Sequence, residues 1–172
     1  MKTKNNRTYY LVQSALIAGI YVAVTFICAP ISFGSVQFRI AEALTVLPVL
    51  TPAAIPGLTV GCIIANLNSP FGLIDIICGS LTTLLAAICS RLTRKICFRN
   101  LPLLSLIFPV LFNGVIVGLE IAFFLPEGFS MLGFLSAGAS VAFGEIVVCY
   151  LAGLPLYSGL NKTGIFKNEE MI

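Results

Sequence analysis

The sequence predicts an all-α membrane protein, a compact bundle of six transmembrane helices that forms a single domain over residues 1–172. Composition is the first reason: 58% of the residues are hydrophobic, only 10% are charged, and the mean hydropathy is +1.03, which excludes an ordinary water-soluble domain. Length is the second reason. A helix needs about 20 apolar residues to cross about 30 Å of hydrocarbon, so the chain has room for about six crossings and little else.

Turn residues and one basic cluster divide the chain into apolar blocks. The expected spans are residues 9–29, 40–52, 53–67, 72–92, 101–125 and 137–159. The first apolar stretch is too long for the core of a signal peptide, and no small-residue cleavage site follows it. The second and third spans are short and contain Pro48, Pro52 and Pro56, so they form either a tight helical hairpin or one bent element.

Basic residues gather before the first span, after the fourth and after the last. They are Lys2, Lys4, Arg7, Arg91, Arg94, Lys95, Arg99, Lys162 and Lys167. The positive-inside rule assigns such clusters to the cytoplasm. We therefore expect both termini and the loop at 91–99 to be cytoplasmic, and the connections 31–38, 66–72 and 126–133 to lie outside.

Polar residues inside the apolar spans indicate where function resides. They are Arg39, Glu42, Asp75, Asn113, Glu120 and Glu145. Counting depth at about 1.5 Å per residue puts most of them in the outer half of the bilayer. Four acids and one arginine within hydrocarbon need protonation, water, or a ligand that brings donors and positive charge. The pattern predicts a ligand site that opens to the exterior.

These residues also have structural explanations. Arg39 and Glu42 are three residues apart and could form an ion pair at the membrane surface. Asp75 and Glu120 have no obvious cationic partner in the sequence, which favours a binding role for both. The connections add three candidates: Gln37, Asn66 and Asn68. Each is either an ordinary turn or loop residue or a polar contact at the mouth of the cavity.

Several function classes are disfavoured by what the sequence lacks. It has no P-loop for ATP, no histidine and no serine in a nucleophile elbow, so we expect no catalysis. Its six cysteines form no C-x-x-C pair, so no metal, cofactor or disulfide is expected. The net charge of +3 gives no indication of nucleic-acid binding. Uphill transport would take its energy from an ion gradient or another subunit.

Small residues recur at four-residue spacing in the first span, at Ala15, Gly19 and Ala23. Such a stripe lets another helix approach its backbone closely. The same spacing recurs at residues 57–65 and 114–122, so it fits either packing within the bundle or docking of a partner.

With these features the chain resembles the substrate-binding S component of energy-coupling factor (ECF) transporters. More narrowly, it resembles the QueT family of queuosine-precursor transporters. The resemblance rests on the stripe, on VQFRIAEAL at 36–44 followed by Pro48, on Gly57 to Gly61, and on NLNSPFG at 66–72. It extends over almost the full chain.

This resemblance implies capture of a deazaguanine base, such as its aminomethyl form, from outside the cell by a multi-pass protein of a prokaryotic plasma membrane. The implied partners are a transmembrane T component, which docks on Ala15, Gly19 and Ala23, and two cytoplasmic ATPase subunits. Asp75, Glu120 and Glu42 are the candidate acceptors for the donors of such a base. The alternatives are an S component for another vitamin or base, a stand-alone ion-coupled carrier, and a membrane-embedded enzyme.

Overall fold

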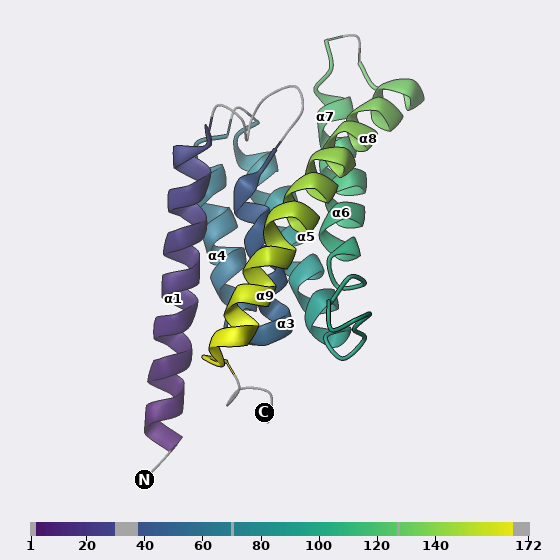
Figure 1. The fold of residues 1–172 in the computed structure, drawn as a ribbon. Helices are drawn as coiled ribbons and strands as arrows, with labels where there is room; N and C mark the ends of the chain where they lie inside the picture. The colour runs from purple at the N-terminus through teal and green to yellow at the C-terminus, as the bar shows by residue number, and fades with distance from the viewer. Residues whose placement is uncertain (1–2, 30–37, 70, 127, 167–172) are drawn as a thin grey trace.

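The computed structural model describes residues 3–29, 38–69, 71–126 and 128–166, with side chains from residue 7 onward. Across these residues the chain folds into helices joined by turns, with one isolated bridge between Phe98 and Leu101. The N-terminal end of the first helix and the C-terminal end of the last lie at the same end of the bundle (Figure 1). The all-helical prediction is confirmed for the described residues.

The first half of the chain forms the elements α1 (Thr3–Ile27), the 3₁₀ helix η1 (Ile40–Val46), α3 (Leu47–Leu50), α4 (Ala54–Asn66) and α5 (Leu73–Leu92). The second and third expected spans form a helical hairpin. Thr51 is extended and breaks the helix, and Ser14 of α1 donates to the carbonyl of Ala53 at this turn. Glu42 and Gly61, one on each arm, both contact Tyr21 of α1, so the two arms run antiparallel.

The second half consists of two interrupted helices. Their parts are α6 (Ile107–Phe112), the π segment η2 (Asn113–Val117), α7 (Gly118–Phe123), α8 (Met131–Val148), the π segment η3 (Cys149–Gly153) and α9 (Leu154–Thr163). The fifth span therefore begins later than predicted. Turns occupy residues 103–106, where Tyr150 and Ser90 donate to the carbonyls of Leu103 and Ser105. The sixth helix extends beyond the predicted span at both ends.

Three helical stretches are long and apolar enough to cross a membrane, judged by length and composition: Arg7–Ile27, Leu73–Leu92 and Met131–Thr163. Three shorter apolar stretches lie at Ile40–Leu50, Ala54–Asn66 and Ile107–Phe123. The hairpin arms are only about 20 Å long, less than the thickness of the hydrocarbon layer. The α8–α9 unit is about 50 Å long and runs obliquely across the bundle (Figure 1); tilting is one way in which a helix longer than the bilayer is accommodated. Six complete crossings remain a prediction.

Glycine contacts hold the bundle together on both sides. A Cβ on Gly61 would lie 2.9 Å from the Cβ of Tyr21, so α4 and α1 touch backbone to backbone. On the other side, a Cβ on Gly118 of α7 would lie 2.5 Å from the Cα of Gly138 of α8. Close approach through small residues is the usual way for helices to associate in lipid, where the hydrophobic effect does not drive them together.

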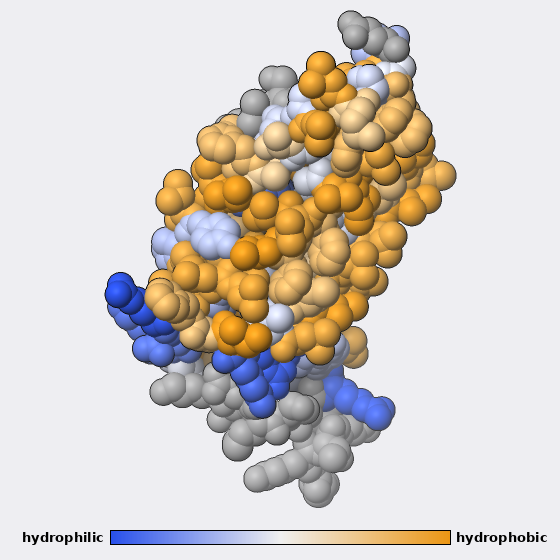
Figure 2. Space-filling view, turned by 90° about the vertical axis from the view of Figure 1, so that its right-hand side faces the viewer, coloured by the Kyte–Doolittle hydropathy of each residue, from blue (hydrophilic) through white to orange (hydrophobic). Residues whose placement is uncertain are grey.

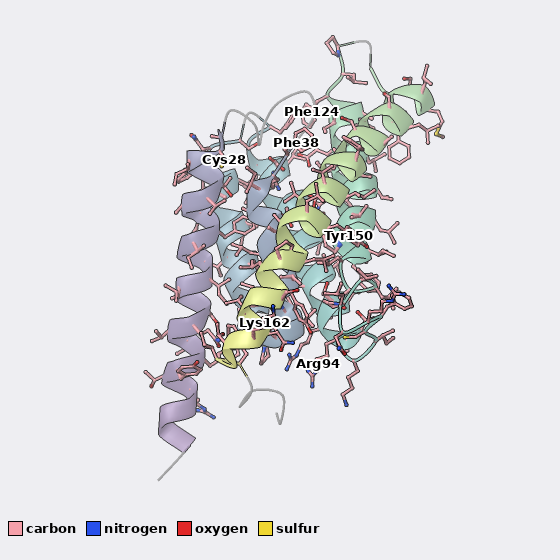
Figure 3. The ribbon with its side chains drawn as sticks, viewed as in Figure 1. Cys28, Phe38, Arg94, Phe124, Tyr150 and Lys162 are labelled. Atoms are coloured by element: carbon pink, nitrogen blue, oxygen red, sulfur yellow. The ribbon has the colours of Figure 1, made fainter. Side chains whose placement is uncertain are left out.

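Charge and hydropathy are segregated along the bundle. Apolar side chains cover most of the face in Figure 2, while the strongly hydrophilic residues gather at its lower end. Arg94 and Lys162 lie at that end, whereas Phe38 and Phe124 lie at the opposite end (Figure 3). The basic clusters that the structure describes therefore share one end, as the topology prediction requires. Their assignment to the cytoplasm stays a prediction.

Candidate functional site

Three buried polar residues meet near the end of the bundle opposite the basic clusters, where Phe38, the neighbour of Arg39, also lies (Figure 3). Arg39, which precedes η1, is 5% exposed and lies 3.7 Å from the carboxylate of Asp75. Its Nη2 atom also donates to the side-chain oxygen of Asn66 at 3.2 Å. The Asn66 amide in turn donates to the backbone carbonyl of Asp75 at 2.9 Å. Three elements, η1, α4 and α5, are thus joined by one buried network.

Local sequence places each member of this network. Asp75 lies in the first turn of α5, where the helix dipole favours negative charge. Asn66 is the last residue of α4, and its side chain fits beside α5 because Gly79 has no side chain. A Cβ at Gly79 would collide with the Asn66 amide nitrogen and lie 3.3 Å from Asp75 Oδ1. Gly79 is therefore part of the site although it offers no polar side chain.

The ion pair differs from the one the sequence suggested. Asp75, expected to have no cationic partner, pairs with Arg39. Glu42, expected to be a possible partner of Arg39, accepts a 2.5 Å hydrogen bond from the hydroxyl of Tyr21. The reason is that Arg39 precedes η1 with a non-helical backbone, so helical spacing does not align it with Glu42, and packing against α5 and α1 selects their partners.

A deeper group of polar side chains joins η1 to the last helix. Cys149 donates to Glu145 Oε2 at 3.5 Å and lies 3.7 Å from the hydroxyl oxygen of Thr45. Glu145 is only 4% exposed. The π segment η3 begins at Cys149, and such segments often mark functional sites because they redirect a helix face.

Glu120 and Asn113 lie on the interrupted helix α6–η2–α7, which packs against α5 and α8. Both side chains are buried, at 5% and 2% exposed. Neither Glu120 carboxylate oxygen has a hydrogen-bond partner among the described residues, and the same holds for the Asn113 side-chain nitrogen. Buried polar atoms of this kind are costly unless something binds them. Glu42 Oε2 is likewise without a partner among the described residues.

Two aromatic rings lie near these acids in the chain. Phe71 and Phe124 pack with ring centroids 5.3 Å apart. Phe71 is four residues before Asp75, and Phe124 is four residues after Glu120.

Not every predicted residue joins the site. Asn68 is exposed in the turn after α4 and lines a shallow groove of about 390 Å³ with Phe26, Ile64 and Leu67, apart from the acids. Gln37 lies outside the described residues, as does most of the connection 31–38. The roles of both stay predictions.

Sequence reasoning missed two members. Tyr21 is fully buried and faces inward with Ile17, opposite the small-residue stripe. Its hydroxyl in the middle of an apolar span was the feature of the sequence that could have identified it. Cys149 was interpreted as a small apolar residue, yet it lies four residues after Glu145, the spacing at which helical side chains meet. Both thiol and hydroxyl supply donors to carboxylates.

The predicted docking stripe is accessible. Ala15, Gly19 and Ala23 are exposed on the outer face of α1, and a Cβ built on Gly19 would meet nothing within 4 Å. Within the described bundle the stripe is thus not used for packing. Gly57 and Gly61, by contrast, pack on the inner face of α1.

The fold and the site together define a class: a helical protein with segments apolar enough to span a membrane and a group of buried acidic side chains. A family model described as QueT transporter matches residues 11–162. The chain belongs to the QueT transporter family.

A curated relative gives the same family name. The Queuosine precursor transporter QueT of Lactococcus lactis subsp. cremoris is 37% identical over 83 residues, which are 47% of this chain and 48% of the relative. The match thus spans about half the length of that relative. No solved structure matches the chain.

Proposed function

We propose that this protein is the substrate-binding S component of an ECF-type importer, and that it captures a queuosine precursor of the deazaguanine class. The observation that carries the proposal is the buried acidic site with unpartnered carboxylate and amide atoms, in a chain that belongs to a transporter family. Energy would come from ATPase subunits, since the chain has no P-loop.

The chemistry of the site fits a base with several donors. The guanine-like edge of a deazaguanine presents an N–H and an amino group, which one carboxylate accepts together. An aminomethyl group adds a cation, which requires a second acid. The Phe71–Phe124 ring pair and the side-chain nitrogen of Asn113 offer an apolar surface and a donor for the ring and its carbonyl.

Binding by the purified protein tests this function directly. Isothermal titration with aminomethyl-deazaguanine should give a single saturable site, and mass spectrometry of the purified protein should identify the same base where it copurifies. Absence of binding by the wild type would refute the substrate assignment. Tight binding of another vitamin would retain the S component role and replace the ligand.

The T component would dock on the stripe of Ala15, Gly19 and Ala23. Gly19→Leu should abolish uptake when the whole transporter is expressed, yet leave ligand binding by the isolated protein intact, because the new side chain points into open space. Gly61→Leu is the matched control, since its side chain would meet Tyr21 and should impair folding itself. Equal loss of uptake and binding in Gly19→Leu would reject the docking role.

A stand-alone proton-coupled carrier is the second candidate. It is favoured by the acids around Cys149, which contacts Glu145 Oε2 and the backbone carbonyl of Glu42. Proteoliposomes that contain only this chain separate the two functions. Substrate flux driven by a proton gradient would establish the carrier, whereas flux that needs the T component and ATP would establish the S component.

A further inference from the structure

Glu120 is a buried carboxylate that forms no salt bridge with any of the described residues. Its side chain is 5% exposed, and both of its oxygens lack hydrogen-bond partners among the described residues. Its helix α7 packs against α5, the helix that carries Asp75, so an ionised Glu120 would need a counter-charge.

The chain itself offers no other cation at this end. Between residues 8 and 90 Arg39 is the only lysine or arginine, and between residues 100 and 161 there is none. Arg94 and Lys162 lie at the opposite end of the bundle (Figure 3). The connection 30–37 also contains no basic residue, so a cation for Glu120 has to come from outside this chain.

Each of the other three buried acids has at least one cation or donor, although Glu42 Oε2 has no hydrogen-bond partner among the described residues. Asp75 has the guanidinium of Arg39 at 3.7 Å. Glu42 accepts from the Tyr21 hydroxyl, and Glu145 accepts from the Cys149 thiol. Glu120 thus differs from the other buried acids in having neither a cation nor a donor among the described residues.

We infer that Glu120 binds a positively charged group of the ligand and thereby makes the site select cationic over neutral bases. The inference rests on the proposed function and deepens it, because it assigns one carboxylate to one chemical group. Asp75, held by Arg39 and Asn66, then positions the network and contributes little to charge selection. An ammonium group that enters beside Glu120 satisfies both orphaned oxygens and restores neutrality where charge is costly.

Two bases with the same ring allow the effect of ligand charge on affinity to be measured separately from the effect of ligand shape. Aminomethyl-deazaguanine carries an ammonium group, whereas the analogue with a nitrile in its place is neutral and similar in size. The measured quantity is the ratio of their dissociation constants, obtained by titration of the purified protein in detergent. Wild type should prefer the cationic base by at least about 30-fold, the range expected for one charge-assisted hydrogen bond in a buried site.

Glu120→Gln should reduce that ratio by at least about tenfold, mainly by weakening the cationic base. Asp75→Asn is the matched control and should change both dissociation constants by similar factors, leaving the ratio near the wild-type value. Glu120→Asp retracts the carboxylate by one methylene and should give an intermediate ratio. If the melting temperature shows that Glu120→Gln does not fold, Glu120→Asp provides the test instead.

The outcomes distinguish this inference from the proposed function. If wild type binds neither base, the proposed function fails. If wild type binds both bases equally well, the site recognises the ring and charge selection by Glu120 is wrong, while the proposed function stands. A ratio that survives in Glu120→Gln and falls in Asp75→Asn would transfer the role to Asp75 and overturn the inference.

Discussion

The two sides of the polar site are built differently. On the side formed by η1, α4 and α5, Arg39, Asn66 and Asp75 contact one another in a closed network. On the side formed by η2 and α7, Asn113 and Glu120 keep buried polar atoms without partners among the described residues. Arg39, Asn66 and Asp75 are therefore paired within the protein, whereas under the proposed function a ligand would complete the second side.

Helix geometry follows the same division. α4 and α5 are regular α-helices, whereas both helices of the second half contain a π segment, at 113–117 and at 149–153. Each π segment begins at a polar residue of the site, Asn113 or Cys149. A π turn loosens the regular hydrogen-bond ladder and rotates the residues that follow it. The helices of the second half are therefore less regular, and their π segments change the orientation of polar side chains.

The largest effect is expected for Arg39→Met, which removes the buried cation of the organised side but keeps an unbranched apolar stem. Asp75 would be left as an uncompensated buried acid, which should lower the free energy of unfolding by about 3 kcal/mol or more. Ligand affinity should fall at least 100-fold with the network lost. Denaturant unfolding in detergent and isothermal titration measure the two quantities.

Its control is the double variant Arg39→Met with Asp75→Leu. Replacing both charges by apolar groups should recover most of the stability without recovering binding. A single variant as stable as wild type would mean that the ion pair does not hold the organised side together.

The next effect concerns the glycine contact behind the second side. Gly118→Val should push α7 away from α8, since its Cβ would approach the backbone of Gly138, and should lower stability by about 2 to 3 kcal/mol. Gly19→Val, which meets nothing within 4 Å, provides the control for β-branching in a helix. If thermal unfolding shows equal small shifts for both, the contact between α7 and α8 is looser than the structure indicates.

A smaller effect is expected for Gly79→Ala. The added methyl group displaces the Asn66 amide, which loses its hydrogen bonds to Arg39 and to the carbonyl of Asp75. Affinity for the ligand should fall about tenfold, equivalent to one or two buried hydrogen bonds. Gly159→Ala, in open space on α9, should bind as wild type does. Unchanged affinity in Gly79→Ala would show that Asn66 does not preorganise the site.

Tyr21→Phe should have the smallest effect. It removes the donor to Glu42 while keeping the ring that packs on Gly61, at a cost of about 1 kcal/mol. The melting temperature should fall by a few degrees. Tyr9→Phe, at an exposed tyrosine, serves as the reference. A shift as large as that of Arg39→Met would instead make α1 the principal support of the site.

The sequence identified most of the buried polar residues because a charged residue within an apolar segment can be recognised without a structure. Arg39, Asp75 and Glu120 stood out as charges in apolar spans, and depth counting placed them together. Their pairing could not be predicted. It depends on contacts between residues 36 positions apart, such as Arg39 with Asp75, which only helix packing determines.

By itself, the sequence determined the helical class, the six apolar segments and the separation of basic clusters from acids, because each follows from the cost of placing polar groups in lipid. The tertiary structure decided the rest. It gave Asp75 its cation, brought Tyr21 and Cys149 to the other acids, and left Glu120 without a partner among the described residues. The physical reason is that local hydropathy fixes which residues enter the membrane, whereas interhelical contacts at glycines fix which side chains meet.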